Sequence, residues 1–289
     1  MAMTEHQSTS EFDPSIVPVV ELNDGNTIPQ LGYGVFKVPP EDTEALVAEA
    51  LKVGYRHIDT AAIYGNEEGV GAAIAKSDVP REELFITTKL WNDRHEDVEA
   101  ALQESLDKLG LDYVDLYLIH WPSTSTGNFK AAWKGLEQAK EQGLAKSIGV
   151  ANFTVKNLED LEMVSKIRPA VNQIELHPYF ARWKEIDAGR VHGTKVESWG
   201  PLGQNKTDLL ENEDILAAAE AHSKTPAQIV LRWHLQNNVI VFPKTATPSR
   251  MRENFDIFDF ELTDAEMLAI NDLDLGEEGR VGSDPDEFS

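Results

Sequence analysis

Four ionisable side chains stand at or just beyond the ends of apolar, strand-like runs in this chain of 289 residues. Asp59 lies at the end of one run, Tyr64 follows it by five residues, and Lys89 and His120 end two later runs. A charged group beside an apolar strand is costly to bury unless the protein uses it or pairs it. One such residue alone has an ordinary reading, as a helix cap, a core histidine or a solvated charge. The four together predict one active site.

These four residue types are suited to delivering a proton to a carbonyl oxygen. Tyr64 can donate the proton, although a free phenol, with a pKa near about 10, is a weak acid at neutral pH. We expect the ammonium of Lys89 to lower that pKa, Asp59 to pair with Lys89, and His120 to hydrogen-bond the substrate oxygen. No side chain donates hydride, so reduction of a carbonyl requires a cofactor.

Alternating strand-like and helical segments must position these residues. Strand-like runs cover residues 31–36, 55–60, 84–89, 114–120, 147–152, 170–176, 195–199 and 239–244, after a β-hairpin over 19–28. This alternation, without a linker rich in Pro, Gly or Ser, predicts an α/β fold: a (β/α)8 TIM barrel with an N-terminal β-hairpin. We expect residues 19–289 to form a single domain and residues 1–18 a disordered tail. Helix N-caps are predicted at Asp42, Asn66, Thr154, Thr225 and Thr263.

The site of such a barrel lies at the carboxyl ends of its strands. Neither a Rossmann G-x-G-x-x-G nor a Walker loop is present. Lys244, Thr245 and Arg250, near a predicted helix start, could instead bind a phosphate by charge, hydroxyl and helix N-terminus. The alternative is an ordinary solvated helix start.

Four segments resemble the aldo-keto reductase family: GYRHIDTAAIYGNE at 54–67, ITTKLWN at 86–92, DLYLIHWP at 115–122 and FPKT at 242–245. The similarity runs from about Val19 to about Arg280. Within the family, residues 31–40, 87–95 and 197–204 resemble the bacterial 2,5-diketo-D-gluconate reductases. The resemblance implies reduction of aldehydes and ketones to alcohols by hydride transfer, with the four roles given above for Asp59, Tyr64, Lys89 and His120.

The resemblance also implies a site for NADPH or NADP+ on the barrel rim. Asn152 and Gln173 would hold the carboxamide, Trp199 would stack on the nicotinamide, and Leu202 would lie along the pyrophosphate. The remaining matches are Lys244, Thr245 and Arg250 for the 2′-phosphate, Glu253 and Asn254 for adenine, and Phe36, Trp91 and Trp121 for the substrate pocket. Ala151 stands where the family usually has Ser, so one carboxamide hydrogen bond is expected to be absent.

Composition narrows the classes of partner. With 50 acidic against 26 basic residues, the formal charge of −24 opposes binding to nucleic acid. There is no cysteine, which excludes disulfides, thiol catalysis and cysteine metal sites, and no metal site is expected. No apolar run has the length of a membrane span, and the N-terminus lacks the order of a signal peptide. We expect a cytoplasmic protein with a small-molecule carbonyl substrate, and the resemblance suggests a monomer.

The substrate and two other mechanisms stay open. The resemblance favours reduction of 2,5-diketo-D-gluconate to 2-keto-L-gulonate, and the alternative is a broad aldehyde or methylglyoxal reductase. Lys89 at a strand end also suits a Schiff-base aldolase, although pairing with Asp59 would keep it charged. An NADPH-binding redox sensor with slow turnover is a further reading. Arg280 and the tail to Ser289 are expected to fold over the substrate pocket.

Overall fold

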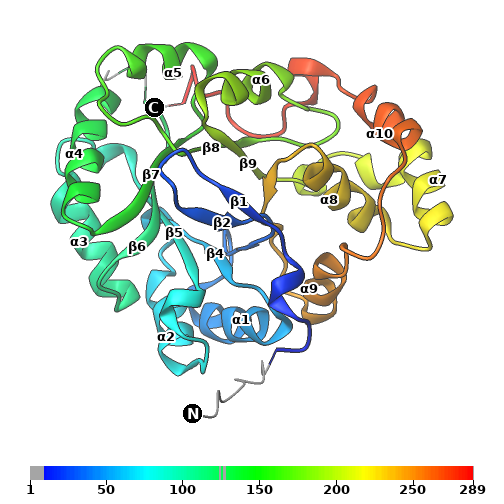
Figure 1. Cartoon of the computed structure of the whole chain (residues 1–289), viewed down its shortest axis with the longest axis horizontal. Helices are drawn as coiled ribbons and strands as arrows, with labels where there is room; N and C mark the ends of the chain where they lie inside the picture. Colours follow the sequence, from blue (N-terminus) through cyan, green and yellow to red (C-terminus); the bar gives the residue numbers. More distant parts are fainter. Residues whose placement is uncertain (1–9, 124, 126–127, 289) are drawn as a thin grey trace.

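The computed structural model of the protein describes residues 10–123, 125 and 128–288. Eight parallel strands form one sheet in chain order: β3 (Tyr33–Gly34), β4 (His57–Asp59), β5 (Phe85–Leu90), β6 (Val114–Ile119), β7 (Ala145–Ala151), β8 (Val171–Glu175), β9 (Lys195–Trp199) and β10 (Ile240–Val241). Leu31 pairs with Val241 beside β3, and the Gly32 N–H donates to the Val241 carbonyl at 2.8 Å. These contacts close the sheet into the predicted (β/α)8 barrel, with helices around its outside (Figure 1).

The predicted hairpin lies across one end of the barrel, as Figure 1 shows. It consists of β1 (Val19–Glu21) and β2 (Thr27–Pro29), paired antiparallel. The side-chain amide of Asn23 donates to the Pro169 carbonyl at 2.9 Å, and that of Asn26 to the Lys146 carbonyl at 3.0 Å. Because these carbonyls lie near the starts of strands, the hairpin covers the amino-terminal end of the barrel and leaves the carboxyl ends free for a site.

The helices follow the strands. They are α1 (Pro40–Val53), α2 (Glu67–Lys76), α3 (Val98–Leu109), α4 (Phe129–Glu141), α5 (Val155–Glu162), α6 (Trp183–His192), α7 (Glu213–His222), α8 (Pro226–Gln236), α9 (Pro248–Phe255) and α10 (Asp264–Asn271). Thr154, Thr225 and Thr263 precede α5, α8 and α10 as predicted, and the structure shows a capping box at each of them.

Two predicted caps were wrong in their contacts. Asp42 lies in the first turn of α1, because Pro40 takes the first helical position, where the missing N–H of proline is not needed. Asn66 precedes α2, but its amide donates to the carbonyls of Val35 and Val38 at 2.9 and 3.2 Å. Its side chain therefore holds the loop after β3.

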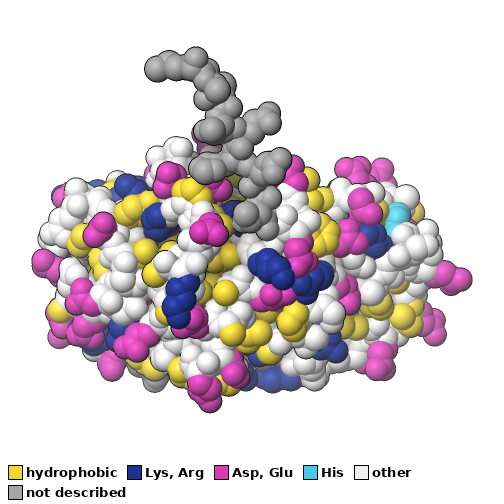
Figure 2. All heavy atoms as spheres, turned by 90° about the horizontal axis from the view of Figure 1, so that it is seen from below, with side chains coloured by type: hydrophobic (Ala, Val, Ile, Leu, Met, Phe, Trp, Pro, Cys, Tyr) yellow, Lys and Arg dark blue, Asp and Glu magenta, His cyan; other side chains and the backbone are white. Residues whose placement is uncertain are grey.

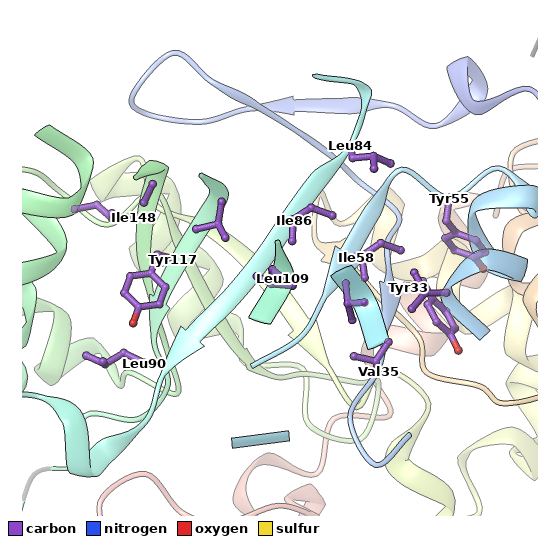
Figure 3. Packing of buried hydrophobic residues seen from close by; sticks show 14 of the residues in the cluster. Tyr33, Val35, Tyr55, Ile58, Leu84, Ile86, Leu90, Leu109, Tyr117 and Ile148 are labelled. Atoms are coloured by element: carbon purple, nitrogen blue, oxygen red, sulfur yellow. The ribbon is translucent and has the colours of Figure 1, made fainter. Parts of the chain in front are cut away.

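Alternation along the strands separates the core from the site. Ile58 and Ile86 point outward into one apolar cluster, in which Figure 3 shows Ile58 beside Tyr33 and Tyr55 and Ile86 on the neighbouring strand. Asp59, one position after Ile58, and Lys89, three positions after Ile86, point to the barrel interior, since strand side chains an odd number of positions apart face opposite sides. The packed outer layer thereby fixes the strands whose inner side chains form the site.

Acidic side chains are spread over the molecular surface with Lys and Arg among them, as one side of the protein shows (Figure 2). This matches the formal charge of −24. Within the described residues, no helix combines the length and the apolar character needed to cross a membrane.

Residues 10–18, part of the segment expected to be a disordered tail, pack against α1 and α9, whereas residues 1–9 lie outside the described residues. The N–H groups of Glu11 and Phe12 donate to the carbonyls of Lys52 and Val53 at 2.8 and 2.9 Å. The Phe12 ring lies 5.2 Å from that of Phe255, measured between centroids. This N-terminal arm, residues 10–18, thus ties the end of α1 to α9.

Replacing Phe12 with alanine should lower the free energy of unfolding by about 1–2 kcal/mol, because a partly buried ring leaves the apolar contact with α9. Urea denaturation measures this change. Ile16→Ala, in the same arm but at an exposed side chain, is the matched control and should change stability by less. Equal effects of the two substitutions would show that the arm does not pack as described.

Candidate active site

The structure brings the four predicted catalytic residues together. The Lys89 ammonium lies 2.7 and 2.9 Å from the carboxylate oxygens of Asp59 and 2.8 Å from the carbonyl oxygen of Thr60. It also lies 3.5 Å from the Tyr64 hydroxyl. The His120 and Tyr64 rings make an edge contact with centroids 5.7 Å apart. A phenol, an ammonium and an imidazole therefore converge at one rim of the barrel.

Strand register and one tight turn produce this arrangement. Asp59 ends β4 and pairs with Thr87 of β5, so Lys89 projects two residues further along the neighbouring strand. Tyr64 ends a 3-10 turn (Ala62–Tyr64), which Gly65 closes in the left-handed region at φ 68°. This conformation, which favours glycine, turns the chain back toward α2.

Burial dominates the electrostatics of the site. It raises the pKa of Tyr64 to about 12, although the charge of Lys89 acts in the opposite direction. The expected net lowering of the Tyr64 pKa was therefore wrong, because desolvation of the phenolate outweighs the attraction of the ammonium. Burial likewise opposes the charged form of Lys89, but Asp59 raises its pKa above the usual value. Burial, and then Lys89, hold the pKa of His120 well below the usual value, so the imidazole is neutral.

Three residues expected to hold the cofactor carboxamide and ring lie beside the catalytic group. Asn152, at φ 62° just after β7, donates its amide to the His120 carbonyl at 2.9 Å and accepts from the indole of Trp199 at 2.8 Å. Gln173 donates to Asp59 at 2.8 Å. Asn152 is thus linked to the backbone of His120 and Gln173 to the side chain of Asp59, whereas Trp199 is linked to His120 through Asn152.

The expected phosphate and adenine positions lie around the start and body of α9. Lys244 and Arg250 are exposed, whereas Thr245 is nearly buried, and its hydroxyl accepts from the Thr247 N–H at 3.1 Å. Asn254 is buried, and Leu202 is partly buried against the core. Glu253 accepts a hydrogen bond from the Thr225 hydroxyl at 2.7 Å. Its carboxylate therefore joins α9 to the N-terminus of α8.

Aromatic side chains surround the catalytic group. The rings of Phe36 and Tyr64 are 5.0 Å apart, and Trp91 stands edge-on to His120 at 5.1 Å. Phe288 packs against Trp121 at 4.3 Å and lies 6.1 Å from Trp91. The tail therefore does reach the expected pocket. Sequence reasoning did not single out Phe288, because its separation along the chain from both tryptophans leaves no local signal.

A buried carboxylate anchors this tail. Glu175, at the end of β8, accepts hydrogen bonds from the N–H groups of Val281 at 2.7 Å and Gly282 at 2.9 Å. Gly282 lies so close to Trp199 that a Cβ there would stand 2.3 Å from the indole. Only glycine fits this approach, and it brings the tail directly beside the expected nicotinamide platform.

Comparison with known proteins agrees with this geometry. Residues 30–275 match the model of the Aldo/keto reductase family. The chain belongs to the aldo/keto reductase family. It is 51% identical to a methylglyoxal reductase DkgA of Yersinia pestis, over 94% of this chain and 97% of that protein. It is therefore an oxidoreductase of this family, which confirms the expected enzyme class.

Two solved structures of the family support the fold. An aldo/keto reductase from Brucella melitensis superposes with a TM-score of 0.86 at 51% identity, over 89% of this chain and all of that one. A mutant of Gox0644 in complex with NADPH superposes with a TM-score of 0.90 at 44% identity, covering 94% of this chain and 99% of that one.

Lys89→Met should destabilise the protein strongly, because it leaves the carboxylate of Asp59 buried without its cation. Removing one partner of a buried ion pair costs about 3–5 kcal/mol of unfolding free energy, which urea denaturation can measure. The double variant Asp59→Asn/Lys89→Met should recover part of this loss, since it leaves no buried charge. Arg94→Met, which removes two surface ion pairs, with Asp97 and Glu104, is the control. A double variant as unstable as Lys89→Met would contradict the pairing.

Proposed function

We propose that this protein reduces the carbonyl group of small aldehydes and ketones with NADPH, and that Tyr64 donates the proton. The contact between the Tyr64 hydroxyl and Lys89, beside a neutral His120, carries this proposal. An aldolase is disfavoured, because Asp59 keeps Lys89 protonated and an ammonium is not a nucleophile.

The residues at the rim fit a nicotinamide group. Both N–H bonds of the Gln173 amide point at carboxyl groups, those of Asp59 and Glu197, which leaves its carbonyl oxygen to accept from a carboxamide. Asn152 has a second amide hydrogen to offer, and the Trp199 indole is held by its hydrogen bond to Asn152. When bound there, reduced nicotinamide supplies the hydride that no side chain can.

The protein groups then handle the proton. His120, neutral and beside Tyr64, can donate an N–H to the substrate carbonyl and orient it. Tyr64 holds its proton at neutral pH, because its pKa is raised to about 12, and passes it to the oxygen as negative charge develops there. Lys89 lies close enough to stabilise the phenolate that remains.

A preference for NADPH over NADH rests on the start of α9. Lys244 and Arg250 are exposed there, and Thr245 adds a hydroxyl, so charge and hydrogen bonds are available to a 2′-phosphate. The mutant of Gox0644, a structure of the same family, holds NADPH. Because the protein has a formal charge of −24, such an anion site requires a local cluster of basic side chains.

For the substrate, we favour small aldehydes of the methylglyoxal type, the alternative raised by the sequence. A DkgA relative is named a methylglyoxal reductase, and Phe288, 4.3 Å from Trp121 between ring centroids, adds an apolar ring to the expected substrate pocket. Reduction of 2,5-diketo-D-gluconate is the second candidate. We further propose that the protein acts as a cytoplasmic monomer, as its composition and family resemblance suggest.

Tyr64→Phe should lower kcat for carbonyl reduction by about 10²–10⁴-fold, because it removes only the proton donor. NADPH oxidation followed by absorbance measures this, with methylglyoxal, an aromatic aldehyde and 2,5-diketo-D-gluconate as substrates. NADPH binding, measured by fluorescence, should persist in the variant. Tight NADPH binding by the wild-type protein without turnover of any carbonyl would favour a redox sensor instead.

Arg250→Ala should weaken NADPH binding by about tenfold or more while changing NADH binding little, since a charge-assisted hydrogen bond to the 2′-phosphate is lost. Fluorescence titration with each cofactor measures the ratio of the two dissociation constants. Arg190→Ala, at an exposed arginine on α6, is the control and should leave that ratio unchanged. Equal weakening of NADPH and NADH would remove Arg250 from the 2′-phosphate site.

A further inference from the structure

A second buried carboxyl group stands behind the catalytic residues. Glu197 lies on β9, is fully buried, and pairs in register with Gln173 on β8. Its Oε2 accepts a hydrogen bond of 2.9 Å from the Gln173 amide nitrogen, and the same nitrogen donates to Asp59 at 2.8 Å. A continuous chain of contacts thus runs from Glu197 through Gln173 and Asp59 to Lys89.

This chain determines which atom Gln173 can present. A side-chain amide nitrogen carries two hydrogens, and the two carboxyl groups take both. The amide therefore cannot rotate without losing two hydrogen bonds to buried acceptors, which is costly in a barrel interior. Its oxygen is left for a ligand, and Glu197 shares with Asp59 the two hydrogen bonds that prevent the amide from turning over.

Glu197, Gln173, Asp59 and Lys89 form a buried layer of polar side chains. The charge in this layer is unbalanced, because two carboxyl groups face one ammonium. Lys89 already lies on Asp59, whereas Glu197 Oε1 has no hydrogen-bond partner among the described residues. His57 Nε2 lies 3.4 Å from Glu197 Oε1, and burial lowers the pKa of His57 to about 3. His57 is therefore neutral, and β10 places only Ile240 beside Glu197.

Glu197 consequently keeps its proton at neutral pH. Burial, followed by the negative charge of Asp59, raises the pKa of Glu197 to about 8. Below that pH the layer holds one anion and one cation, which is the arrangement that a low dielectric tolerates. Above it, a second anion faces Lys89 and Tyr64, which opposes formation of the phenolate and makes Tyr64 a weaker acid.

We propose that Glu197 is a positioning residue for carbonyl reduction: as a buried carboxylic acid, it holds the Gln173 amide toward the cofactor and keeps Asp59 paired with Lys89. The inference rests on the proposed function, since it assigns Gln173 and Tyr64 their roles there. It adds a consequence that the four catalytic residues alone do not imply. Loss of the Glu197 proton should slow reduction at alkaline pH.

The first test compares wild type with Glu197→Gln, which keeps the hydrogen-bond acceptor and removes the titration. In the cofactor-free wild type, carbon-13 NMR of labelled glutamate should show one carboxyl that titrates near pH 8 and is missing from the variant. The ratio of kcat at pH 9 to kcat at pH 7 should be higher in Glu197→Gln, by up to about tenfold, because one unit above its pKa an acid is mostly ionised.

The second test uses Glu197→Leu, which removes the acceptor as well. Its Kd for NADPH should rise by about tenfold or more as Gln173 loses its fixed orientation, while Glu197→Gln should bind more tightly than Glu197→Leu. Ser198→Ala, on the same strand with its hydroxyl bonded to the Leu176 carbonyl, is the control.

Either of two results overturns the proposal: a Glu197 carboxyl that titrates at its ordinary pH, or a Glu197→Gln variant whose pH profile matches that of wild type. If Glu197→Leu does not fold, the NMR titration and the Glu197→Gln profile still decide. If wild type reduces no carbonyl, the proposed function fails, whereas the NMR titration continues to report on Glu197.

Discussion

The buried ion pair between Lys89 and Asp59 is the constraint on which the site depends. The Lys89 side chain is fully buried and that of Asp59 is 2% exposed, so each charge requires the other as its counter-ion. Hydrogen bonds from Lys89 to the Thr60 carbonyl and from Gln173 to Asp59 complete the pairing. A pair of this kind is poor evidence for stability, because desolvation offsets much of its attraction. Its retention in the barrel is better explained by what lies next to it, the Tyr64 hydroxyl.

The opposing effects at Tyr64 suit a proton donor in reduction. Reasoning from residue types led us to expect a lowered pKa, as an ammonium alone would produce. In the structure, burial acts more strongly and raises the pKa to about 12. A phenol that keeps its proton until the carbonyl oxygen becomes negative is matched to the reductive direction. In the proposed mechanism, Lys89 would act on the phenolate as it forms, when its charge has most effect.

Local patterns predicted the fold well. The bounds of β9 were predicted to the residue, and three threonine caps were correct, because alternation and capping depend on neighbours in sequence. Asn66 failed as a cap, since its partners, Val35 and Val38, lie on another loop. The short β10 was over-predicted, because its apolar run continues past the point where pairing with β9 ends.

Local sequence patterns did not predict the contacts between segments that lie far apart in the chain. The run at 195–199 predicted a strand but not that Glu197 would meet Gln173 and face Asp59 across the barrel. Phe288 gave no signal beyond its position in the tail. The hydrogen bond from Arg252 to the Glu11 side chain likewise joins two residues that lie far apart in the sequence. The four predicted catalytic residues were found because Asp59, Lys89 and His120 lie at the carboxyl ends of strands and Tyr64 follows one of them, and barrel geometry brings such positions together.

The C-terminal tail connects the two halves of the site. Burial alone would raise the pKa of Glu175, but hydrogen bonds from His177 and from the N–H groups of Val281 and Gly282 lower it, so the anchor is a carboxylate. Gly282 lies against Trp199, on the side expected for the cofactor, and Phe288 lies against Trp121, on the side expected for the substrate. One short segment thus touches both sides of the expected site. Substrate range in this protein should therefore depend on the tail and its anchor as well as on the barrel that holds the catalytic residues.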